Sequence, residues 1–237
     1  MSLKYLLFDL DGTLLPMDND EFTRKYFKLL AAKLAPHGYD GAQLVEAIWS
    51  GVAAMVKNDG TRTNEAAFWQ RMTEIYGGKI LGDKGLFEDF YAHDFEKARA
   101  FCGFNAAAAR VVRRAKERGY RVALATNPLF PRVATDMRIR WAGLEPEDFE
   151  LVTTYEDSPY CKPNPDYYRY VLARLGASPE ESLMTGNDLG EDVRAAGRAG
   201  IRGFLLTDCL INRENEDISA LPHGGFDELE AFLDTCP

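Results

Sequence analysis

The sequence predicts an α/β fold, a doubly wound parallel sheet (a Rossmann-like core) with an inserted all-helical cap. Short apolar runs bounded by turn residues alternate with helical patterns towards both ends of the chain, which is typical of buried parallel strands. Between them, residues 17–101 carry apolar side chains at helical spacing. The length of 237 residues, with 46% hydrophobic and 27% charged residues, suits a globular protein of one or two domains.

Five short apolar runs are expected to form the strands of the sheet. They are Tyr5–Phe8, Val122–Thr126, Leu151–Thr154, Leu183–Thr185 and Phe204–Leu206. Helical patterns lie between and after them, at Ala106–Arg118, Arg132–Trp141, Tyr167–Leu175, Glu191–Ala199 and Phe226–Leu233. Asn164-Pro165 resembles a helix start, and Gly119, Gly176 and Gly200 resemble helix ends. Strands alternating with helices predict a parallel sheet with helices on both faces.

The stretch after the first strand breaks this alternation. Phe22, Tyr26, Leu29, Leu30 and Leu34 follow helical spacing, which returns in residues 44–56 and 65–76. Loops rich in Gly, Asn and Asp separate these segments. We therefore expect a core of residues 1–16 and 102–237, and a helical cap of residues 17–101. Trp49, Phe68 and Trp69 are expected in the interior of the cap.

The charge balance excludes several classes of partner. With 28 Lys and Arg against 37 Asp and Glu, the net charge is −9, which argues against nucleic-acid binding and against docking to an anionic membrane. No apolar run approaches the length of a membrane span. Four scattered cysteines and three isolated histidines indicate reduced thiols in a cytoplasmic protein and no zinc site. The oligomeric state stays open, and a monomer is compatible with the sequence.

The strongest motif is Phe8-Asp9-Leu10-Asp11-Gly12-Thr13 at the end of the first expected strand. Ligands of open parallel sheets bind beyond the carboxyl ends of the strands, so Asp9 and Asp11 lie where chemistry is expected. Two carboxylates this close repel each other unless a cation or a shared proton relieves them. A solvated turn is the alternative. A calcium loop is excluded because Thr13 and Leu14 stand where such a loop needs Asp or Asn and Gly.

Three further elements follow later strands. Thr126 and Asn127 come after the second strand, Lys162 after the third, and Gly186-Asn187-Asp188-Leu189-Gly190-Glu191-Asp192 after the fourth. Each has a structural alternative: a turn or cap, a solvated lysine, and a capped helix start, respectively. If Asp188 and Asp192 are both helical, they share one face, which is unfavourable unless a cation lies opposite.

In this order the four elements resemble the motifs of the haloacid dehalogenase superfamily, over essentially the whole chain. The resemblance implies a phosphatase-like hydrolase in which Asp9 attacks phosphorus and forms an aspartyl-phosphate, while Asp11 acts as general acid and base. It also implies Mg²⁺ held by Asp9, the backbone carbonyl of Asp11 and an acid of the last motif. Thr126, Lys162 and Asn127 would then contact or orient the phosphate.

The last motif departs from the common family pattern. Many members carry Asp directly after the glycine, whereas this chain has Asn187 there and Asp188 next. Either could be the inner metal ligand; we favour Asp188, because a carboxylate suits Mg²⁺ better than an amide does. Asp192 would then support the inner ligands without binding the metal directly.

The family also contains mutases, phosphonate-cleaving enzymes and dehalogenases, and a non-catalytic phospho-ligand-binding protein is a further alternative. Dehalogenation needs no proton donor, so Asp11 favours phosphoryl chemistry. Nothing marks a cap lysine (Lys25, Lys28, Lys33 or Lys57) for a Schiff base. A helical cap would exclude macromolecules and leave a small phosphorylated metabolite as substrate. Arg62 and Lys57 are candidates to bind a second anionic group on it, although an exposed polar loop explains them equally well.

Overall fold

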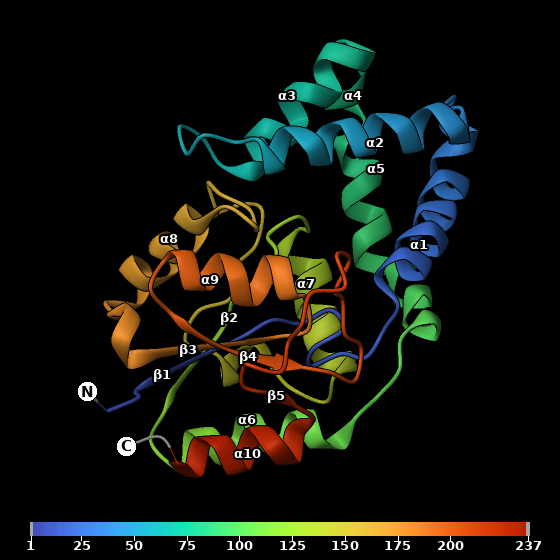
Figure 1. Ribbon diagram of the computed structural model, residues 1–237. Helices are drawn as coiled ribbons and strands as arrows, with labels where there is room; N and C mark the ends of the chain where they lie inside the picture. The colour runs from blue at the N-terminus through green and yellow to red at the C-terminus, as the bar shows by residue number, and fades with distance from the viewer. Residues whose placement is uncertain (1, 236–237) are drawn as a thin grey trace.

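The computed structural model describes residues 2–235 and confirms the doubly wound α/β fold with a helical cap (Figure 1). Five parallel strands form one sheet in the order β2-β1-β3-β4-β5. The strands are β1 (Tyr5–Phe8), β2 (Arg121–Leu124), β3 (Ser182–Gly186), β4 (Arg202–Leu206) and β5 (His223–Gly224). β1 lies between β2 and β3, and all four of its residues are buried, which explains its continuous apolar run.

Helices cover both faces of the sheet. Leu6 and Phe8 of β1 belong to the apolar cluster that includes residues of α6, α7 and α10, whereas Tyr5 and Leu7 pack with residues of α8 and α9. The helices of the core are α6 (Ala106–Glu117), α7 (Arg132–Trp141), α8 (Pro165–Leu175), α9 (Ala195–Arg198) and α10 (Phe226–Thr235). The predicted start of α8 is confirmed, with Asn164 as cap and Pro165 in the first turn.

The inserted segment is helical, as predicted, and lies above the sheet in Figure 1. Its α-helices are α1 (Asn19–Leu34), α2 (Gly41–Val56), α3 (Asn64–Tyr76), α4 (Lys79–Gly82) and α5 (Lys84–Asp89). A π-helical turn (Phe90–Asp94) and a 3₁₀ helix (Phe95–Phe101) follow. The chain leaves the core and returns to it at one place, where the Gly103 N–H donates to the carbonyl of Pro16 at 2.7 Å.

Some predicted elements differ from the structure. Leu151–Thr154 is not a regular strand: only Val152 bridges to Leu124 beside β2. The ladder ends there because the Tyr155 N–H turns away to the carbonyl of Phe130. The expected helix Glu191–Ala199 begins earlier, as a π-helical turn (Leu189–Arg194) that continues into α9. The two-residue strand β5 was not predicted, since it is too short to form an apolar pattern.

Two expectations concern the chain as a whole. Within residues 2–235, no helix is both long and apolar enough to cross a bilayer. Cys102, Cys161 and Cys209 are free thiols, and Cys236 lies outside the described residues.

Candidate active site

The sequence motifs converge at one edge of the sheet because its strands are parallel. Asp9 directly follows β1, and Asn187 directly follows β3. The Asp9 N–H donates to the carbonyl of Thr185 at 2.9 Å, and the Ala125 N–H donates to the carbonyl of Phe8 at 2.7 Å. These bonds extend the pairing beyond the strand ends, so that Asp9, Thr126 and Asn187 are brought to the same edge.

Both oxygens of the Asp9 carboxylate accept hydrogen bonds. Lys162 Nζ donates to Oδ1 at 2.8 Å, and Thr13 Oγ1 lies 3.1 Å from Oδ2. Thr13 Oγ1 also lies 2.9 Å from Oδ1 of Asn187, so its single proton serves either acceptor. Sequence patterns assign no role to Thr13 beyond its place in the motif. The carboxylate of Asp9 is thus held in one orientation from two sides.

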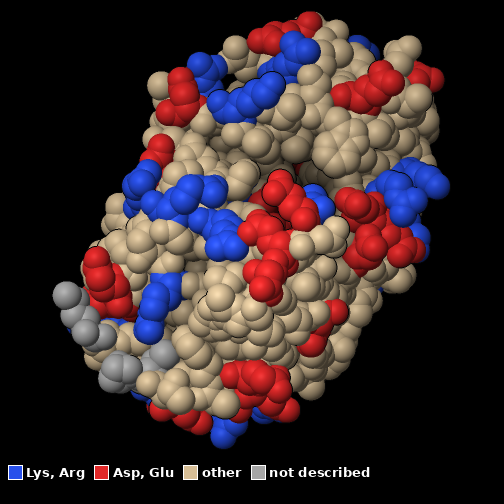
Figure 2. All heavy atoms as spheres, viewed as in Figure 1, with Lys and Arg blue, Asp and Glu red and all other residues tan. Residues whose placement is uncertain are grey.

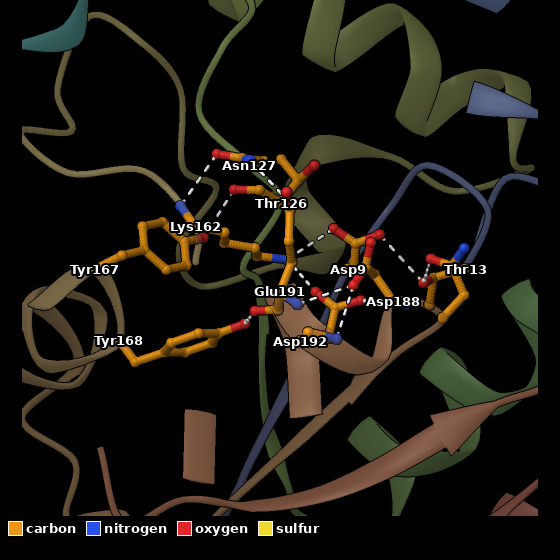
Figure 3. A network of polar contacts seen from close by, with 12 residues as sticks. Asp9, Thr13, Thr126, Asn127, Lys162, Tyr167, Tyr168, Asp188, Glu191 and Asp192 are labelled. Carbon is orange, nitrogen blue, oxygen red and sulfur yellow. Dashed lines mark hydrogen bonds and ion pairs between the residues drawn. The ribbon is translucent and has the colours of Figure 1, made fainter. Parts of the chain in front are cut away.

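Lys162 lies between two acids (Figure 3). Its ammonium donates to Asp9 Oδ1 and, at 2.6 Å, to Oδ1 of Asp192, and its side chain is 1% exposed. Burial alone would lower the pKa of Lys162, but Asp192 and Asp9 together raise it well above its usual value. Burial raises the pKa of Asp192, and the Lys162 charge opposes this rise. The lysine therefore neutralises an otherwise unfavourable pair of buried carboxylates.

Two glycines permit this close packing. A Cβ on Gly186 would lie 2.1 Å from Oδ2 of Asp192, and one on Gly12 would lie 2.4 Å from Nδ2 of Asn187. Gly12 also has φ +83°, a conformation that side chains rarely adopt. Gly12 is therefore required by the approach of Asn187 to the first loop, and Gly186 by the position of Asp192 within the acidic turn.

Asn127 links the second and fourth motifs. Its Oδ1 accepts from the backbone N–H of Lys162 at 3.2 Å, and its Nδ2 donates to Oε2 of Glu191 at 3.0 Å. Burial raises the pKa of Glu191, with the Lys162 charge opposing. The carbonyl of Thr126 accepts from the hydroxyls of Thr153 and Tyr167, each at 2.7 Å. These contacts fix the end of β2 and leave Thr126 in the wall of the site cavity.

Asp188 has a structural role that the sequence left as an alternative. Its Oδ1 accepts from the backbone N–H groups of Gly190 and Glu191 at 2.8 and 2.9 Å, so it caps the following helical turn. Its Oδ2 pairs with Arg213 at 2.9 Å. Asn187 is oriented differently, because its Nδ2 donates to the carbonyl of Cys209 at 2.7 Å and its Oδ1 faces Thr13 beside Asp9.

The carboxylate of Asp11 points towards α7. Its Oδ2 pairs with the guanidinium of Arg138, whose side chain is fully buried in α7. Its Oδ1 is buried and has no hydrogen-bond partner. Burial raises the pKa of Asp11, and Arg138 opposes this rise. The sequence analysis did not identify Arg138.

A cavity of about 230 Å³ joins these residues to the cap. Its walls include Asp9, Asp11, Thr126, Asn127, Asn187, Asp188, Glu191, Asp192 and Arg213 from the core and Met17, Asn19, Asp20, Phe22, Thr23 and Trp49 from the insertion. Figure 2 shows acidic side chains gathered beside the hollow between cap and core. Trp49 is 51% exposed, so the prediction that it lies in the cap interior is wrong, whereas Phe68 and Trp69 are buried.

The structure contradicts the predicted substrate contact of Arg62. Arg62 and Lys57 line a separate hollow of about 220 Å³ on the cap, which shares no residue with the site cavity. The guanidinium of Arg62 hydrogen-bonds Gln70 of α3. The loop that carries both cations packs on the core at Tyr160, but Arg62 and Lys57 themselves do not line the cavity of Asp9.

Comparison with known proteins decides the family. A family model described as haloacid dehalogenase-like hydrolase matches residues 3–200, which include all four motifs. The chain belongs to this family. The prediction of a phosphatase-like hydrolase of the haloacid dehalogenase superfamily is thereby confirmed.

Curated proteins of the family share part or most of this hydrolase's length. YhcW of Bacillus subtilis (strain 168) is 27% identical over 206 residues, which are 86% of this chain and 83% of that protein. Pyrophosphatase PpaX of Bacillus cereus (strain AH820) is 34% identical over 102 residues, 43% of this chain and 45% of that protein. Glyceraldehyde 3-phosphate phosphatase of Methanothermobacter thermautotrophicus is 28% identical over 103 residues, 44% of each. The chain thus matches less than half of the latter two relatives.

Solved structures share the fold of this hydrolase over its whole length. A HAD phosphatase from Thermococcus onnurineus has a TM-score of 0.60 at 20% identity, covering 98% of both chains. CbbY from Rhodobacter sphaeroides, in complex with phosphate, has a TM-score of 0.59 at 22% identity and covers 98% of this chain and 99% of that one.

Proposed function

We propose that the protein is a Mg²⁺-dependent phosphatase that hydrolyses a small phosphorylated metabolite through an aspartyl-phosphate on Asp9. One observation carries the proposal. The Asp9 carboxylate is held by Lys162 and Thr13 at the wall of a cavity; Asp11, two residues further on, lines the same cavity, and its buried Oδ1 has no hydrogen-bond partner. A fixed nucleophile beside a proton carrier is what transfer of a phosphoryl group requires.

The reaction follows in two steps. An oxygen of Asp9 attacks phosphorus, the bond from phosphorus to the ester oxygen breaks, and that oxygen keeps the electron pair and takes a proton from Asp11. Water then attacks phosphorus and gives its proton to Asp11, and the bond from phosphorus to Asp9 breaks. Inorganic phosphate leaves, and both carboxyl groups return to their starting states. Thr126, at the end of β2, is placed to contact the phosphoryl oxygens.

The oxygen atoms at the site fit Mg²⁺. Among residues 2–235, no three His, Cys, Asp or Glu side chains are grouped as a metal site. Mg²⁺ needs no such cage, because it is bound by one or two carboxylates together with water and phosphate oxygens. Asp9, the backbone carbonyl of Asp11 and Oδ1 of Asn187 are the ligands that we propose. When bound, the ion supplies positive charge that offsets the repulsion between the phosphate and Asp9.

This ligand set revises the choice between Asn187 and Asp188. The carboxylate of Asp188 is occupied by the helix start and by Arg213. Oδ1 of Asn187 lies next to Thr13, on the Asp9 side of the site. Asp192 is then a positioning residue, since its carboxylate contacts Lys162 and the backbone N–H of Asp188.

The cavity limits the substrate to a small monoester. We propose the division into residues 1–16 and 102–237 as the catalytic core and residues 17–101 as the cap whose helices close the cavity. Among the described residues, the cation that lines the cavity is Arg213, which already pairs with Asp188, while Asp20, Glu191 and Asp188 add negative charge. A substrate with a second phosphate or a carboxylate would meet this negative field, so we propose a leaving group that is neutral or positively charged.

No cap lysine supports phosphonate cleavage. Among the described residues, the cavity lining contains no lysine. Lys25 pairs with Glu21, and Lys33 pairs with Asp89 and Asp94, in both cases with partial exposure to solvent. Neither is desolvated as a Schiff-base lysine needs to be.

The test uses a generic aryl phosphate with Mg²⁺. We expect the wild type to hydrolyse 4-nitrophenyl phosphate and Asp9→Asn to lose at least about 10³-fold in kcat, because a nucleophile is removed. Thermal unfolding of the two proteins serves as the control for folding. An Asp9→Asn variant with wild-type activity, or a wild type without activity on aryl and metabolite phosphates, would contradict the proposal.

The charge preference is tested with a two-carbon series. Phosphoethanolamine, ethyl phosphate and phosphoglycolate differ in the end group, which is an ammonium, a methyl group and a carboxylate. We expect kcat/KM to be lowest for phosphoglycolate. The opposite order would remove the charge preference and leave the phosphatase proposal intact.

A further inference from the structure

Arg138 is a charged side chain that the reaction outlined above leaves without a role. It lies on α7, and no part of its side chain is exposed. Among residues 2–235, Asp11 is the only carboxylate that forms an ion pair with it. A buried guanidinium is unfavourable unless it is paired, and an apolar side chain would pack this position more cheaply. The pairing with Asp11 is therefore the contact that accounts for an arginine at this position.

The remaining contacts of Arg138 hold its guanidinium in place. Nε donates to the carbonyl of Ala134 at 3.2 Å, and Nη2 lies 3.4 Å from Oγ1 of Thr135, one turn back on the same helix. The guanidinium carbon lies 4.0 Å from the centre of the Phe130 ring. With the helix on one side and the ring on another, Nη1 points to Oδ2 of Asp11.

The pair distinguishes the two oxygens of Asp11. Arg138 occupies Oδ2, whereas Oδ1 is buried without a hydrogen-bond partner, in a residue that lines the site cavity. Lys162 and Thr13 anchor Asp9 in a comparable way. Each of the two reacting carboxyl groups thus has its own buried cation, although the two cations come from different parts of the chain.

We propose that Arg138 is a positioning residue for the acid–base step: it holds Asp11 so that Oδ1 exchanges the proton with the leaving oxygen and, later, with water. This inference rests on the proposed phosphatase function. Arg138 touches no reacting atom itself, and its effect passes through Asp11. Loss of Arg138 should therefore matter most when the leaving group depends on a proton.

The experiment compares two aryl phosphates of similar shape, phenyl phosphate and 4-nitrophenyl phosphate. Phenol leaves poorly without a proton, whereas the more acidic 4-nitrophenol leaves readily. We measure kcat/KM, which reports the step in which the leaving group departs. For Arg138→Met we expect kcat/KM to fall about 10- to 100-fold on phenyl phosphate and less than about 3-fold on 4-nitrophenyl phosphate. The first loss is part of the rate acceleration that a general acid typically contributes. Arg138→Lys should recover part of the loss on phenyl phosphate.

Arg140→Met is the matched control, because Arg140 lies on the same helix and pairs with Glu145 at the surface. It should leave both substrates unchanged. Equal losses on both substrates for Arg138→Met would overturn the inference and indicate a purely structural role. A wild type inactive on both substrates would instead remove the proposed function itself.

A second comparison applies even if Arg138→Met folds poorly. Asp11→Asn removes the charge that Arg138 pairs with, and Asp11→Asn/Arg138→Met removes both charges. If Arg138 acts through Asp11, the second substitution does not lower kcat/KM on phenyl phosphate further. An additional loss of tenfold or more in the folded double variant would overturn the inference.

Discussion

Two lysines, one in the core and one in the cap, each bridge two carboxylates, and their surroundings differ. In the core, Lys162 contacts Asp9 and Asp192 at 2.8 and 2.6 Å, and its side chain is 1% exposed. In the cap, Lys33 contacts Asp89 and Asp94 at 2.5 and 2.9 Å, and its side chain is 29% exposed. The distances are similar, so the interaction geometry alone does not separate the buried triad from the exposed one.

Burial separates them. Water screens the charges around Lys33, so removing that lysine leaves two carboxylates that solvent can still stabilise. Lys162, Asp9 and Asp192 are buried, so the two acids are unfavourable without their cation. We therefore expect the core to depend on Lys162, and the cap to tolerate the loss of Lys33.

The largest expected effect is that of Lys162→Met. It leaves two buried carboxylates unpaired, so we expect a loss of about 3–5 kcal/mol in the free energy of unfolding. Loss of the anchor of Asp9 should also lower kcat by about 10²-fold or more. Urea unfolding and the rate on 4-nitrophenyl phosphate measure the two effects. Lys33→Met is the matched control, and a comparable drop in its unfolding midpoint would show that burial is not what distinguishes the triads.

A smaller effect is expected from adding one methyl group to Gly186. The new Cβ of Gly186→Ala would meet Asp192 Oδ2 at 2.1 Å, so the carboxylate has to move away from Lys162. We expect a loss of about 1–3 kcal/mol in the free energy of unfolding, the usual cost of overpacking. The cap offers the control in Gly85, an exposed glycine within α5 where a Cβ has open space. Gly85→Ala should stabilise the protein by about 0.5–1 kcal/mol. A change of the same sign in the free energy of unfolding for both variants would contradict this interpretation.

The smallest expected effect separates the two candidate metal ligands within the core. Asn187→Ala should raise the Mg²⁺ concentration for half-maximal activity by about tenfold, as loss of a ligand contact does. Asp188→Ala should raise it less, because Asp188 caps a helix and pairs with Arg213. A Mg²⁺ titration of both variants, with unfolding as the stability control, decides the order. The reverse order would restore Asp188 as the inner ligand.

The sequence was informative where a pattern is local. Apolar runs predicted β1 and β3, and the parallel order then placed Asp9, Thr126 and the glycine-rich turn at one edge. Asn164 and Pro165 similarly predicted the start of α8. Leu151–Thr154 was predicted as a full strand, but it pairs with β2 only through the bridge of Val152 and a few backbone hydrogen bonds before Tyr155 turns to Phe130, a contact that no local pattern contains.

Other parts of the site depend on contacts between distant residues. Arg138 and the exposed Arg140 lie in the same helix, and the local sequence does not distinguish them. What distinguishes Arg138 is its contact with Asp11, 127 residues earlier in the chain. The loop sequence could not show that Arg62 faces Gln70 and lines a hollow separate from the site cavity, because that orientation depends on packing. The choice between Asn187 and Asp188 depends on side-chain orientation, which Thr13 and Arg213 determine.

The contact between Pro16 and Gly103 has a consequence for how such a protein can change. The insertion leaves and rejoins the core where the Gly103 N–H meets the Pro16 carbonyl at 2.7 Å, so its two ends are as close as those of a tight turn. The entropic cost of closing a loop grows only with the logarithm of its length. Helices can therefore be added to or removed from this segment at little cost to the sheet. We therefore expect that the inserted helices can change in evolution while Asp9 and Lys162 keep their positions.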